Sequence, residues 1–375
     1  MLEANLRPSE AYFPVMKPSV LLLSAYDAAS HRYWRNWMTG TLDDYQWTVV
    51  ALADRHFYWR VRSNALTYTG QYREKLNRHY DLIVATSMTD LATLRGLMPS
   101  LARIPTIVYF HENQFAYPIS ENHRHKSNII NAQLNSVFSA LAAHKLLFNS
   151  NYNRHTFFSG AQALFRRMPD GVKPNILDQC ESNAQTLAVP ITLSPPQMIK
   201  KQSSPLEIVW NHRWEYDKQP EIFFQSMLRL SEQGHYFRLH VVGQSFRTVP
   251  ACFSEAKVQL ANHIASWGYL PDDHYHQILS QAHIVVSTAA HDFQGLSMLE
   301  AISRGCVPVA PRRVAYPEYI PASLMYDPDN EVESLTTLLQ KLLLHGLPPV
   351  PDVTRYTGQA LSGCYQKVLQ QALNL

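Results

Sequence analysis

Cationic side chains follow an apolar run in the second half of the chain, at a spacing that suits a phosphate-bearing ligand. The segment W-N-H-R-W-E-Y-D-K-Q-P at 210–220 holds Arg213 and Lys218. A guanidinium can grip two phosphate oxygens and an ammonium adds a point charge, so the pair could neutralise a diphosphate leaving group. The alternative is a pair of surface cations matched with Glu215 and Asp217.

A second segment, 283–311, predicts a strand, a loop, a helix opened by Gly295 and another strand. The start of a helix offers unpaired N–H groups and a partial positive charge, which suit a phosphate. Asp292 lies in the loop, and Glu300 lies on the helix, where a carboxylate can accept both hydroxyls of a ribose. Taken alone, the two acids are equally typical of a solvated helix flank. Gly243 ends a further apolar run, where a backbone can approach a ligand closely.

These residues need a scaffold that brings strand ends together. Short apolar runs alternate with longer mixed segments, which predicts parallel sheets covered by helices. We expect strands at 20–25, 47–53, 82–85, 106–110, 145–148, 207–210, 239–242, 284–287 and 307–310. The segment S-P-P-Q-M-I-K-K-Q-S-S-P at 194–205 predicts a linker. Two doubly wound α/β domains follow, with ligands beyond the carboxyl ends of the strands and the default site between the domains.

The first half supplies candidates for a second substrate. His111 follows the strand expected at 106–110, and as a neutral imidazole it could hydrogen-bond a sugar or receive a proton. Residues 55–78 hold six Arg and Lys against one Glu, interleaved with five aromatic residues. Cations contact phosphates and aromatic faces stack on unpaired bases, so the stretch suits RNA. A helix with a basic outer face and aromatic core contacts would give the same pattern.

Composition excludes several classes of protein. The 375 residues are 46% hydrophobic and 17% charged, with a net charge of +3, so the chain is not disordered. No apolar run approaches the ~20 residues of a membrane span, and the first residues lack the apolar core of a signal peptide. The four cysteines are far apart and form no C-x-x-C motif. We therefore expect a cytoplasmic protein with reduced thiols and no contact with membranes.

The order of the second-half motifs resembles that of the GT-B retaining glycosyltransferases of family 4. In that family an Arg and a Lys follow the first strand of the second domain, and an E-x7-E motif lies further on. Here Asp292 stands for the first Glu, Gln294 looks inserted before Gly295, and Glu300 matches the second Glu. The resemblance implies an α/β GT-B fold of two Rossmann-like, doubly wound domains facing a cleft. It also implies a first acid near the donor sugar and a second near the ribose.

Several blocks also resemble the tRNA-queuosine mannosyltransferases. They are Y-D-A-A-S-H at 26–31, H-F-Y-W-R-V-R-S-N-A-L at 56–66, Y-F-H-E-N-Q-F-A-Y-P at 109–118, the segment at 210–220 and S-M-L-E-A-I-S-R-G-C-V-P-V-A-P at 297–311. The resemblance implies retaining transfer of mannose from GDP-mannose to queuosine in the anticodon of an aspartate tRNA. One departure lies in the first loop, where the family's Gly-Gly is Ala28-Ala29.

The two resemblances, with the bottom-up argument, assign the site residues. The catalytic residues are His111, Asp292, Arg213 and Lys218. The donor-binding residues are Arg213, Lys218, Gly243, Phe293, Gly295, Leu296 and Glu300. The acceptor-binding residues are Tyr26, Ser30, His31, Trp59, Arg60, Arg62 and Asn113. We expect no metal and no cofactor, because Arg213 and Lys218 make a metal unnecessary for the diphosphate and Asp327-Pro328-Asp329 reads as a turn.

We expect residues 1–195 to bind the acceptor, 205–350 to bind the donor, and 355–375 to form a helix that packs back on the first domain. The expected partners are tRNA, through its anticodon loop, and a nucleotide sugar. Two other interpretations stay open at this point. One is a transferase of the same fold acting on a lipid, a glycan or a small molecule. The other is a non-catalytic RNA-binding protein with a decayed donor site.

Overall fold

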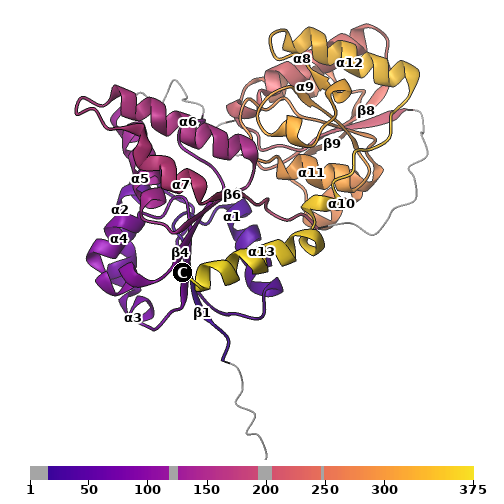
Figure 1. Ribbon diagram of the computed structural model, residues 1–375. Coiled ribbons are helices and arrows are strands. Elements are labelled where there is room, and N and C mark those ends of the chain that lie inside the picture. The colour runs from indigo at the N-terminus through magenta and orange to yellow at the C-terminus, as the bar shows by residue number, and fades with distance from the viewer. Residues whose placement is uncertain (1–15, 118–125, 193–204, 246–248) are drawn as a thin grey trace, which may run out of the picture.

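The computed structural model describes residues 16–117, 126–192, 205–245 and 249–375. Two α/β domains, each built on a parallel sheet, lie side by side (Figure 1). The linker predicted at 194–205 lies almost entirely outside the described residues. Within the described ranges, no helix combines the length and the apolar character needed to cross a bilayer.

The first domain is built on a six-stranded sheet with the order β2-β1-β3-β4-β5-β6. Its strands are β1 (Ser19–Ser24), β2 (Gln46–Ala51), β3 (Leu82–Thr86), β4 (Thr106–Phe110), β5 (Lys145–Phe148) and β6 (Ala184–Thr186). Its helices are α1 (Ala29–Thr41), α2 (Phe57–Gln71), α3 (Arg73–Leu76), α4 (Leu91–Leu97), α5 (Lys126–Leu141), α6 (Asn151–Arg167) and α7 (Asp178–Ser182). All strand pairs are parallel, as the continuous apolar runs predicted.

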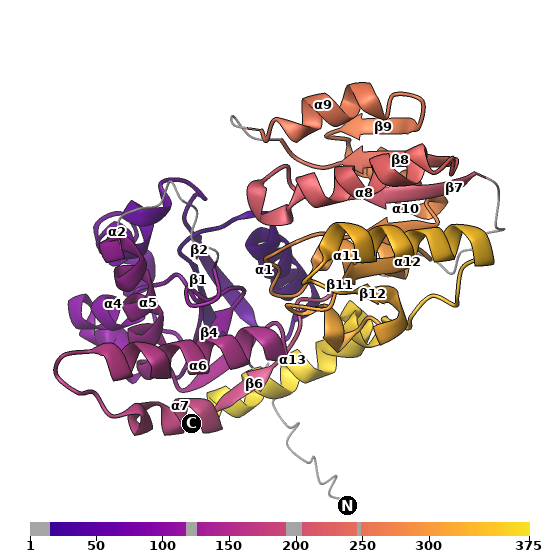
Figure 2. The same ribbon diagram turned by 90° about the horizontal axis from the view of Figure 1, so that it is seen from above.

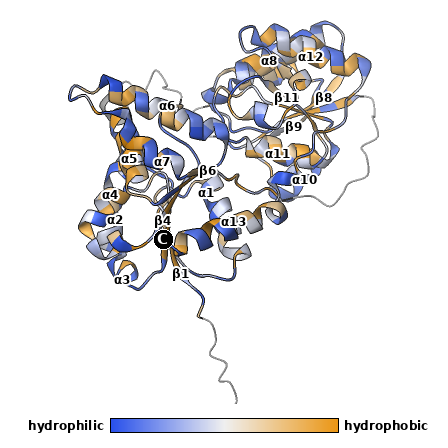
Figure 3. Ribbon diagram, viewed as in Figure 1, coloured by the Kyte–Doolittle hydropathy of each residue, from blue (hydrophilic) through white to orange (hydrophobic). Residues whose placement is uncertain are grey.

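The two faces of this sheet are covered by different helices, because successive side chains of a strand point to opposite sides. Leu21 and Leu23 of β1 belong to the core that α2, α4, α5 and α6 cover. Val20 and Leu22 belong to the other core, which includes Trp34 of α1. Figure 3 shows the apolar strands inside each domain and hydrophilic helix surfaces outside.

The second domain is built on a sheet with the order β12-β11-β10-β7-β8-β9, also entirely parallel. Its strands are β7 (Leu206–Trp210), β8 (Phe237–Val242), β9 (Ile264–Gly268), β10 (Ile284–Val286), β11 (Val307–Pro311) and β12 (Met325–Tyr326). Its helices are α8 (Pro220–Glu232), α9 (Cys252–Gln259), α10 (Asp272–Gln281), α11 (Leu296–Ser303) and α12 (Glu331–His345). Strand order reverses between β7 and β10, and such a switch point is where open α/β sheets bind ligands.

The last helix, α13 (Gly358–Leu373), crosses from the second domain to the first (Figure 1). Its Tyr365 is buried against α1, where Trp34 Nε1 donates to the Tyr365 hydroxyl at 2.9 Å. The same hydroxyl donates to the Ala188 carbonyl at 2.9 Å. The helices α1 and α11 lie next to one another at the domain boundary (Figure 2), where Leu296 packs against the core that contains Trp34. The carboxyl ends of both sheets are therefore held close to one boundary.

Candidate active site

The donor side of the site begins where β7 and β10 end, at the switch point of the second sheet. Asn211 and His212 follow β7 and are buried, while Arg213 keeps 49% of its side chain exposed and pairs with Glu215 at 2.9 Å. Burial raises the pKa of Glu112 in the first domain, whereas His31, then His291 and then the Arg213 charge lower it. Arg213 thus lies just beyond the end of β7, and its contact with a diphosphate stays a prediction.

Lys218 is buried beneath this edge, because Pro220 starts α8 directly after its short turn. Its Nζ donates to the His291 carbonyl at 2.6 Å and lies 3.2 Å from the Asp217 carboxylate. Burial and then the Lys218 ammonium lower the pKa of His212 and of His291 to about 4. Both imidazoles are therefore neutral at pH 7, and the cation is fixed close to the loop that carries Asp292.

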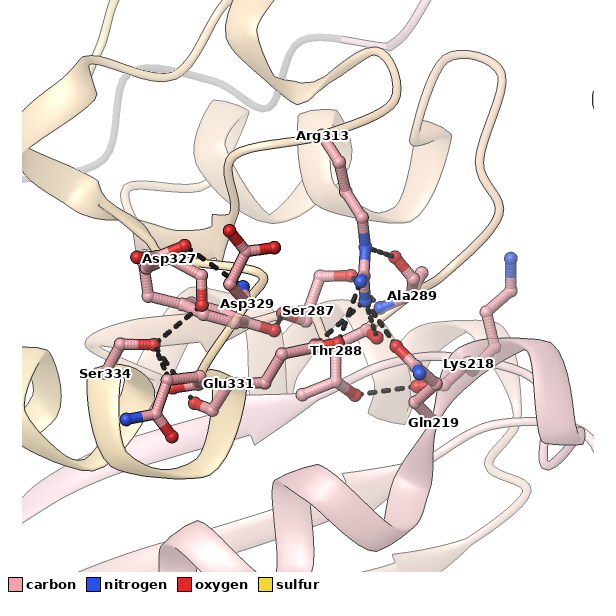
Figure 4. Close-up of polar contacts among 12 residues, drawn as sticks. Lys218, Gln219, Ser287, Thr288, Ala289, Arg313, Asp327, Asp329, Glu331 and Ser334 are labelled. Atoms are coloured by element: carbon pink, nitrogen blue, oxygen red, sulfur yellow. Dashed lines mark hydrogen bonds and ion pairs between the residues drawn. The ribbon is translucent and has the colours of Figure 1, made fainter.

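Arg313, which follows β11, ties the donor-side loops together and was missed by the sequence analysis (Figure 4). Its guanidinium binds both oxygens of Glu331, at 2.8 and 2.9 Å, and also contacts Gln219. It donates to the Ala289 carbonyl at 3.0 Å and to the Thr288 carbonyl at 3.1 Å. An Arg after a strand is not informative by itself, since its partners lie up to 94 residues away in sequence.

Figure 4 also shows that the Lys218 side chain points away from the Arg313 group, while its backbone carbonyl accepts from the Thr288 hydroxyl at 2.6 Å. The turn predicted at Asp327-Pro328-Asp329 is present, because the Asp329 N–H donates to the Asp327 carboxylate at 3.0 Å. Among the described residues, no group of three or more His, Cys, Asp or Glu side chains is arranged to hold a metal ion.

Asp292 is held within its own loop rather than pointing freely at a ligand. The Gly295 N–H donates to one carboxylate oxygen at 2.9 Å, and the Tyr316 hydroxyl donates to the other at 3.1 Å. Burial raises the pKa of Asp292. Lys218, followed by His212, His291 and the Tyr316 hydroxyl, together lower it by more, so the net shift is downward. The ionised carboxylate therefore fixes the loop at the start of α11.

Gly295 is the N-cap of α11, as the sequence predicted, and only glycine suits the position. Its φ of +76° is left-handed, and an added Cβ would lie 2.4 Å from the Tyr319 hydroxyl. Gly243 allows a different close approach, because a Cβ there would lie 1.9 Å from the His212 carbonyl oxygen. The space on the Cβ side of Gly243 is therefore filled by the backbone after β7, and contact of this glycine with a ligand stays a prediction.

Glu300 lies one helical turn beyond the start of α11, next to a hydrogen-bond network in which one acceptor has no partner. The Tyr275 hydroxyl donates to its carboxylate at 3.3 Å, and Asn211 Nδ2 donates to that hydroxyl at 3.0 Å. Burial raises the pKa of Glu300. The buried Oδ1 of Asn211 has no hydrogen-bond partner among the described residues, which leaves an acceptor beside the carboxylate.

Phe293 and Leu296 lie at the domain boundary. The Phe293 ring is buried and lies edge-on to the His291 ring, with centroids 4.6 Å apart. It also meets Tyr152 of the first domain at 5.9 Å. Leu296 packs against the cores of both domains. The two apolar residues therefore join the domains beside the donor loop.

The first domain contributes a compact group of ionisable residues at the end of β4. His31 Nε2 lies 3.4 Å from a Glu112 carboxylate oxygen, and its Nδ1 hydrogen-bonds the Tyr26 carbonyl. Burial is the largest single effect and lowers the pKa of His31, but Glu112, the Tyr26 carbonyl and Asp27 together raise it by more, so the net shift is upward. His111 lies beside this pair, with its ring centroid 4.1 Å from that of His31. Burial and then His31 lower the pKa of His111 well below its usual range, so His111 is neutral.

The domain boundary holds buried imidazole nitrogens from both domains that have no hydrogen-bond partner in the described part of the chain. They are Nε2 of His31, Nε2 of His111, Nε2 of His212 and Nε2 of His291. Buried polar atoms are normally paired, so each such group needs an explanation. The His291 ring also lies 4.4 Å from that of Tyr117, which places the two strand-end edges in contact. The arrangement can bind a polar, many-hydroxyl ligand between the domains.

The remaining acceptor candidates occupy different environments. Tyr26 and the exposed Ser30 flank the start of α1 near His31. Asn113 is fully buried, and its amide is used within the fold: Nδ2 donates to Asn153 and Thr156, and Oδ1 accepts from the Phe115 and Ala116 N–H groups. Asn113 therefore shapes the loop after β4 and has no group left for an acceptor, which corrects that assignment.

The basic stretch forms α2, whose first ring, Phe57, meets Tyr26 edge-on at 5.7 Å. Trp59 is 78% exposed, and Arg62 is exposed while lying 3.8 Å from the Asp90 carboxylate. Arg60 is partly buried. The helix therefore presents an aromatic ring and a cation to solvent, starting beside the cleft.

Comparison with known proteins agrees with this geometry. The family model described as tRNA-queuosine alpha-mannosyltransferase N-terminal matches residues 19–191, and the model described as glycosyl transferases group 1 matches residues 207–345. A tRNA-queuosine alpha-mannosyltransferase of Drosophila melanogaster is 30% identical over 324 residues, which cover 84% of this chain and 85% of that protein.

Solved structures with the same fold include a sucrose-phosphate synthase from Thermosynechococcus elongatus, with a TM-score of 0.66 and 13% identity over 95% of this chain and 99% of that one. Another is HepE from Anabaena in complex with UDP, with a TM-score of 0.60 and 14% identity over 95% of this chain and 100% of that one. These likenesses confirm the GT-B fold. Together with the two family matches and the Drosophila relative, they show that the chain is a glycosyltransferase that belongs to the tRNA-queuosine alpha-mannosyltransferase family.

Proposed function

We propose that the protein transfers mannose, with retention, from GDP-mannose to queuosine in the anticodon of the aspartate tRNA, and that it acts in the cytoplasm. The observation that carries the proposal is the convergence of charged and unpaired polar groups from both sheets on one cleft. Burial raises the pKa of Glu112 in the first domain and His31 lowers it. His291 and Arg213 of the second domain lower it as well. The proposed donor-binding and acceptor-binding residues therefore lie close to one another at the domain boundary.

Each donor residue has a role that its surroundings support. Arg213 and Lys218 stabilise the departing diphosphate by charges fixed before the reaction, with the N–H groups at the start of α11 beside them. Glu300 accepts hydroxyls of the ribose, next to Asn211. Asp292 holds the loop, and the neutral His111 lies near the transferred sugar.

The proposed reaction needs no metal and no added cofactor. The bond from the anomeric carbon to the diphosphate oxygen breaks, and its electron pair leaves with the diphosphate. The acceptor oxygen forms the new bond, and its proton passes to the diphosphate. The acceptor RNA lies along α2, where the exposed Trp59 stacks on an unpaired base and Arg62 contacts a phosphate.

The test is mass spectrometry of tRNA nucleosides from cells with and without the gene. We expect a hexose on queuosine only where the gene is present. Purified protein should then transfer labelled mannose from GDP-mannose to queuosine-containing tRNA, and should do so less well from UDP-glucose. A lipid-linked or free glycan product in place of modified tRNA would overturn the proposal, and so would tRNA binding without donor turnover.

A further inference from the structure

Glu112 is a partly exposed, ionised carboxylate near the boundary with the second domain. Its side chain keeps 23% of its surface exposed, and His31 is its one hydrogen-bonding or ion-pairing partner among the described residues. Since that contact uses one carboxylate oxygen, the other oxygen is available to a ligand. Glu112 lies two residues after the end of β4, so the sheet holds its backbone in place.

The His31 ring fixes the direction of this carboxylate. A carbonyl can only accept, so the bond to the Tyr26 carbonyl requires a hydrogen on Nδ1. The other nitrogen faces the Glu112 carboxylate at 3.4 Å, which favours a hydrogen there as well. The fully buried ring of His31 is thus held between a carbonyl and a carboxylate, and its pKa is raised above the usual value.

The titratable groups that act on Glu112 come from three elements. His31 lies on α1, Arg213 follows β7, and His291, which is neutral at pH 7, follows β10. Behind the pair, Asp27 acts on His31 from the end of β1, and His111 is held neutral. A hydroxyl that donates its hydrogen to Glu112 would therefore have its oxygen between this carboxylate and the cations of the second domain. In the proposed reaction the diphosphate leaves beside those cations.

We infer that Glu112, oriented by His31, accepts a hydrogen bond from the acceptor hydroxyl and aims its oxygen at the anomeric carbon of the donor. The inference deepens the proposed function and rests on it. Glu112 touches the substrate and is a catalytic residue in that sense, whereas His31 is a positioning residue that acts through Glu112.

The carboxylate orients the hydroxyl but does not remove its proton. Burial is the largest single effect and raises the pKa of Glu112, but His31, His291 and Arg213 together lower it by more. A carboxylate with a lowered pKa is a poor base for a hydroxyl but still a strong hydrogen-bond acceptor. The proton therefore leaves to the diphosphate, and the bonds that form and break are those of the proposed reaction.

The experiment compares Glu112→Gln, Glu112→Asp and the exposed control Glu181→Gln with the wild-type enzyme. For each we would measure mannose transfer to queuosine-containing tRNA, slow hydrolysis of GDP-mannose without tRNA, and the Kd values for GDP-mannose and tRNA. We expect Glu112→Gln to lower kcat for transfer by about 100-fold, a typical loss for one oriented polar contact at a reacting group, with hydrolysis and both Kd values unchanged. Glu112→Asp should restore part of the transfer, and Glu181→Gln should match the wild type.

A pH profile separates this role from a purely structural one. In the wild type, kcat for transfer should fall as pH rises through the pKa of His31, which the Glu112 charge holds above its usual value against the effect of burial. In Glu112→Gln this basic limb should move to lower pH. The Glu112 charge would no longer offset the effect of burial, so the pKa of His31 would fall. Replacing His31 by Asn should remove the limb.

The outcomes distinguish the inference from the proposed function. Transfer at the wild-type rate by Glu112→Gln would overturn the role of Glu112 alone. So would a loss of donor hydrolysis in the same proportion as transfer, because Glu112 would then act on the donor. A wild-type enzyme that binds GDP-mannose and modifies no tRNA would overturn the proposed function, and the acceptor contact with it.

Discussion

The side-chain amide of Gln294 and the backbone of Val189 exchange two hydrogen bonds across the domain boundary. The Val189 N–H donates to Oε1 at 2.9 Å, and Nε2 donates to the Val189 carbonyl at 2.8 Å. Gln294 lies in the donor loop between Phe293 and Gly295, and Val189 lies in the extended segment after β6. The residue that looked like an insertion in the motif therefore fixes the donor loop to the other domain.

Replacing Gln294 by Ala should lower the midpoint of urea denaturation and the thermal midpoint. The buried N–H and C=O of Val189 would lose their partners, and one unsatisfied buried group costs about 1–3 kcal/mol. The matched control is Gln366→Ala, whose amide bonds Asp44 at 2.8 Å on the surface and should matter by less than about 0.5 kcal/mol. Equal effects of the two changes would show that the exchange across the boundary adds nothing.

Gly295→Ala should destabilise the second domain and reduce donor binding. The left-handed φ costs about 1–2 kcal/mol for a residue with a Cβ, and the Tyr319 hydroxyl stands 2.4 Å from where that Cβ would lie. Tyr319→Phe in the same chain should recover part of the loss, because it removes the clashing oxygen.

The control for that change is Gly363→Ala, on the exposed side of α13, where an added Cβ meets nothing within 4 Å. It should stabilise the protein by about 0.5–1 kcal/mol, since Ala is the better helix former. Thermal and urea denaturation of both variants measure the difference. If Gly295→Ala left the thermal and urea midpoints unchanged, the argument that only glycine suits this N-cap would be contradicted.

The strands could be predicted from sequence where they are continuous apolar runs. Thr106–Phe110 and Lys145–Phe148 have the predicted bounds, because every side chain of such a strand is buried or nearly so. β6 and β12 were missed, since runs of three and two residues carry no period. β9 was missed because Ile264–Gly268 is only half buried and includes Ser266.

The sequence could place only those site residues that lie close to the end of a strand or the start of a helix. Lys218, Glu300 and His111 lie near the cleft because each is a short step from a strand or helix end. Asn113 was misassigned because the sequence does not say which way a polar side chain after a strand points. Arg313 was missed because its function in the fold depends on partners distant in sequence.

Arg213→Ala should lower kcat for mannose transfer by about 100- to 1,000-fold, the usual cost of removing one fixed charge from a leaving group. Binding of tRNA should change little. The control is Arg229→Ala, since Arg229 is exposed to the same degree, 47% against 49%, and pairs with Glu333 at 2.8 Å as Arg213 pairs with Glu215 at 2.9 Å. Equal losses of turnover and tRNA affinity would argue against a role at the diphosphate.

Chelation should leave the activity intact. With Arg213 and Lys218 carrying the charge of the diphosphate, we expect the same rate of transfer in the presence of EDTA. The measurement is mannose transfer to tRNA after dialysis against the chelator, with and without added manganese. Activity that disappears on chelation and returns with manganese would contradict the metal-free reaction.

The exposed ring of Trp59 should contribute to tRNA binding independently of the donor site. Trp59→Ala should weaken the tRNA complex by about 1–3 kcal/mol, the usual contribution of one base stacked on an aromatic ring, while the Kd for GDP-mannose stays constant. Tyr236→Ala removes another largely exposed ring, on the second domain just before β8, and should leave tRNA affinity unchanged.

Arg62 should act through charge, and salt separates its contribution from that of Trp59. Arg62→Ala should reduce the slope of log Kd against log salt by about 1, as expected for the loss of one phosphate contact, whereas Trp59→Ala should leave the slope unchanged. Filter binding from low to physiological salt measures both. Since Arg62 lies 3.8 Å from Asp90, Asp90→Asn is the complementary variant and should strengthen tRNA binding slightly at low salt. A slope that neither change alters would place the RNA on another surface of the first domain.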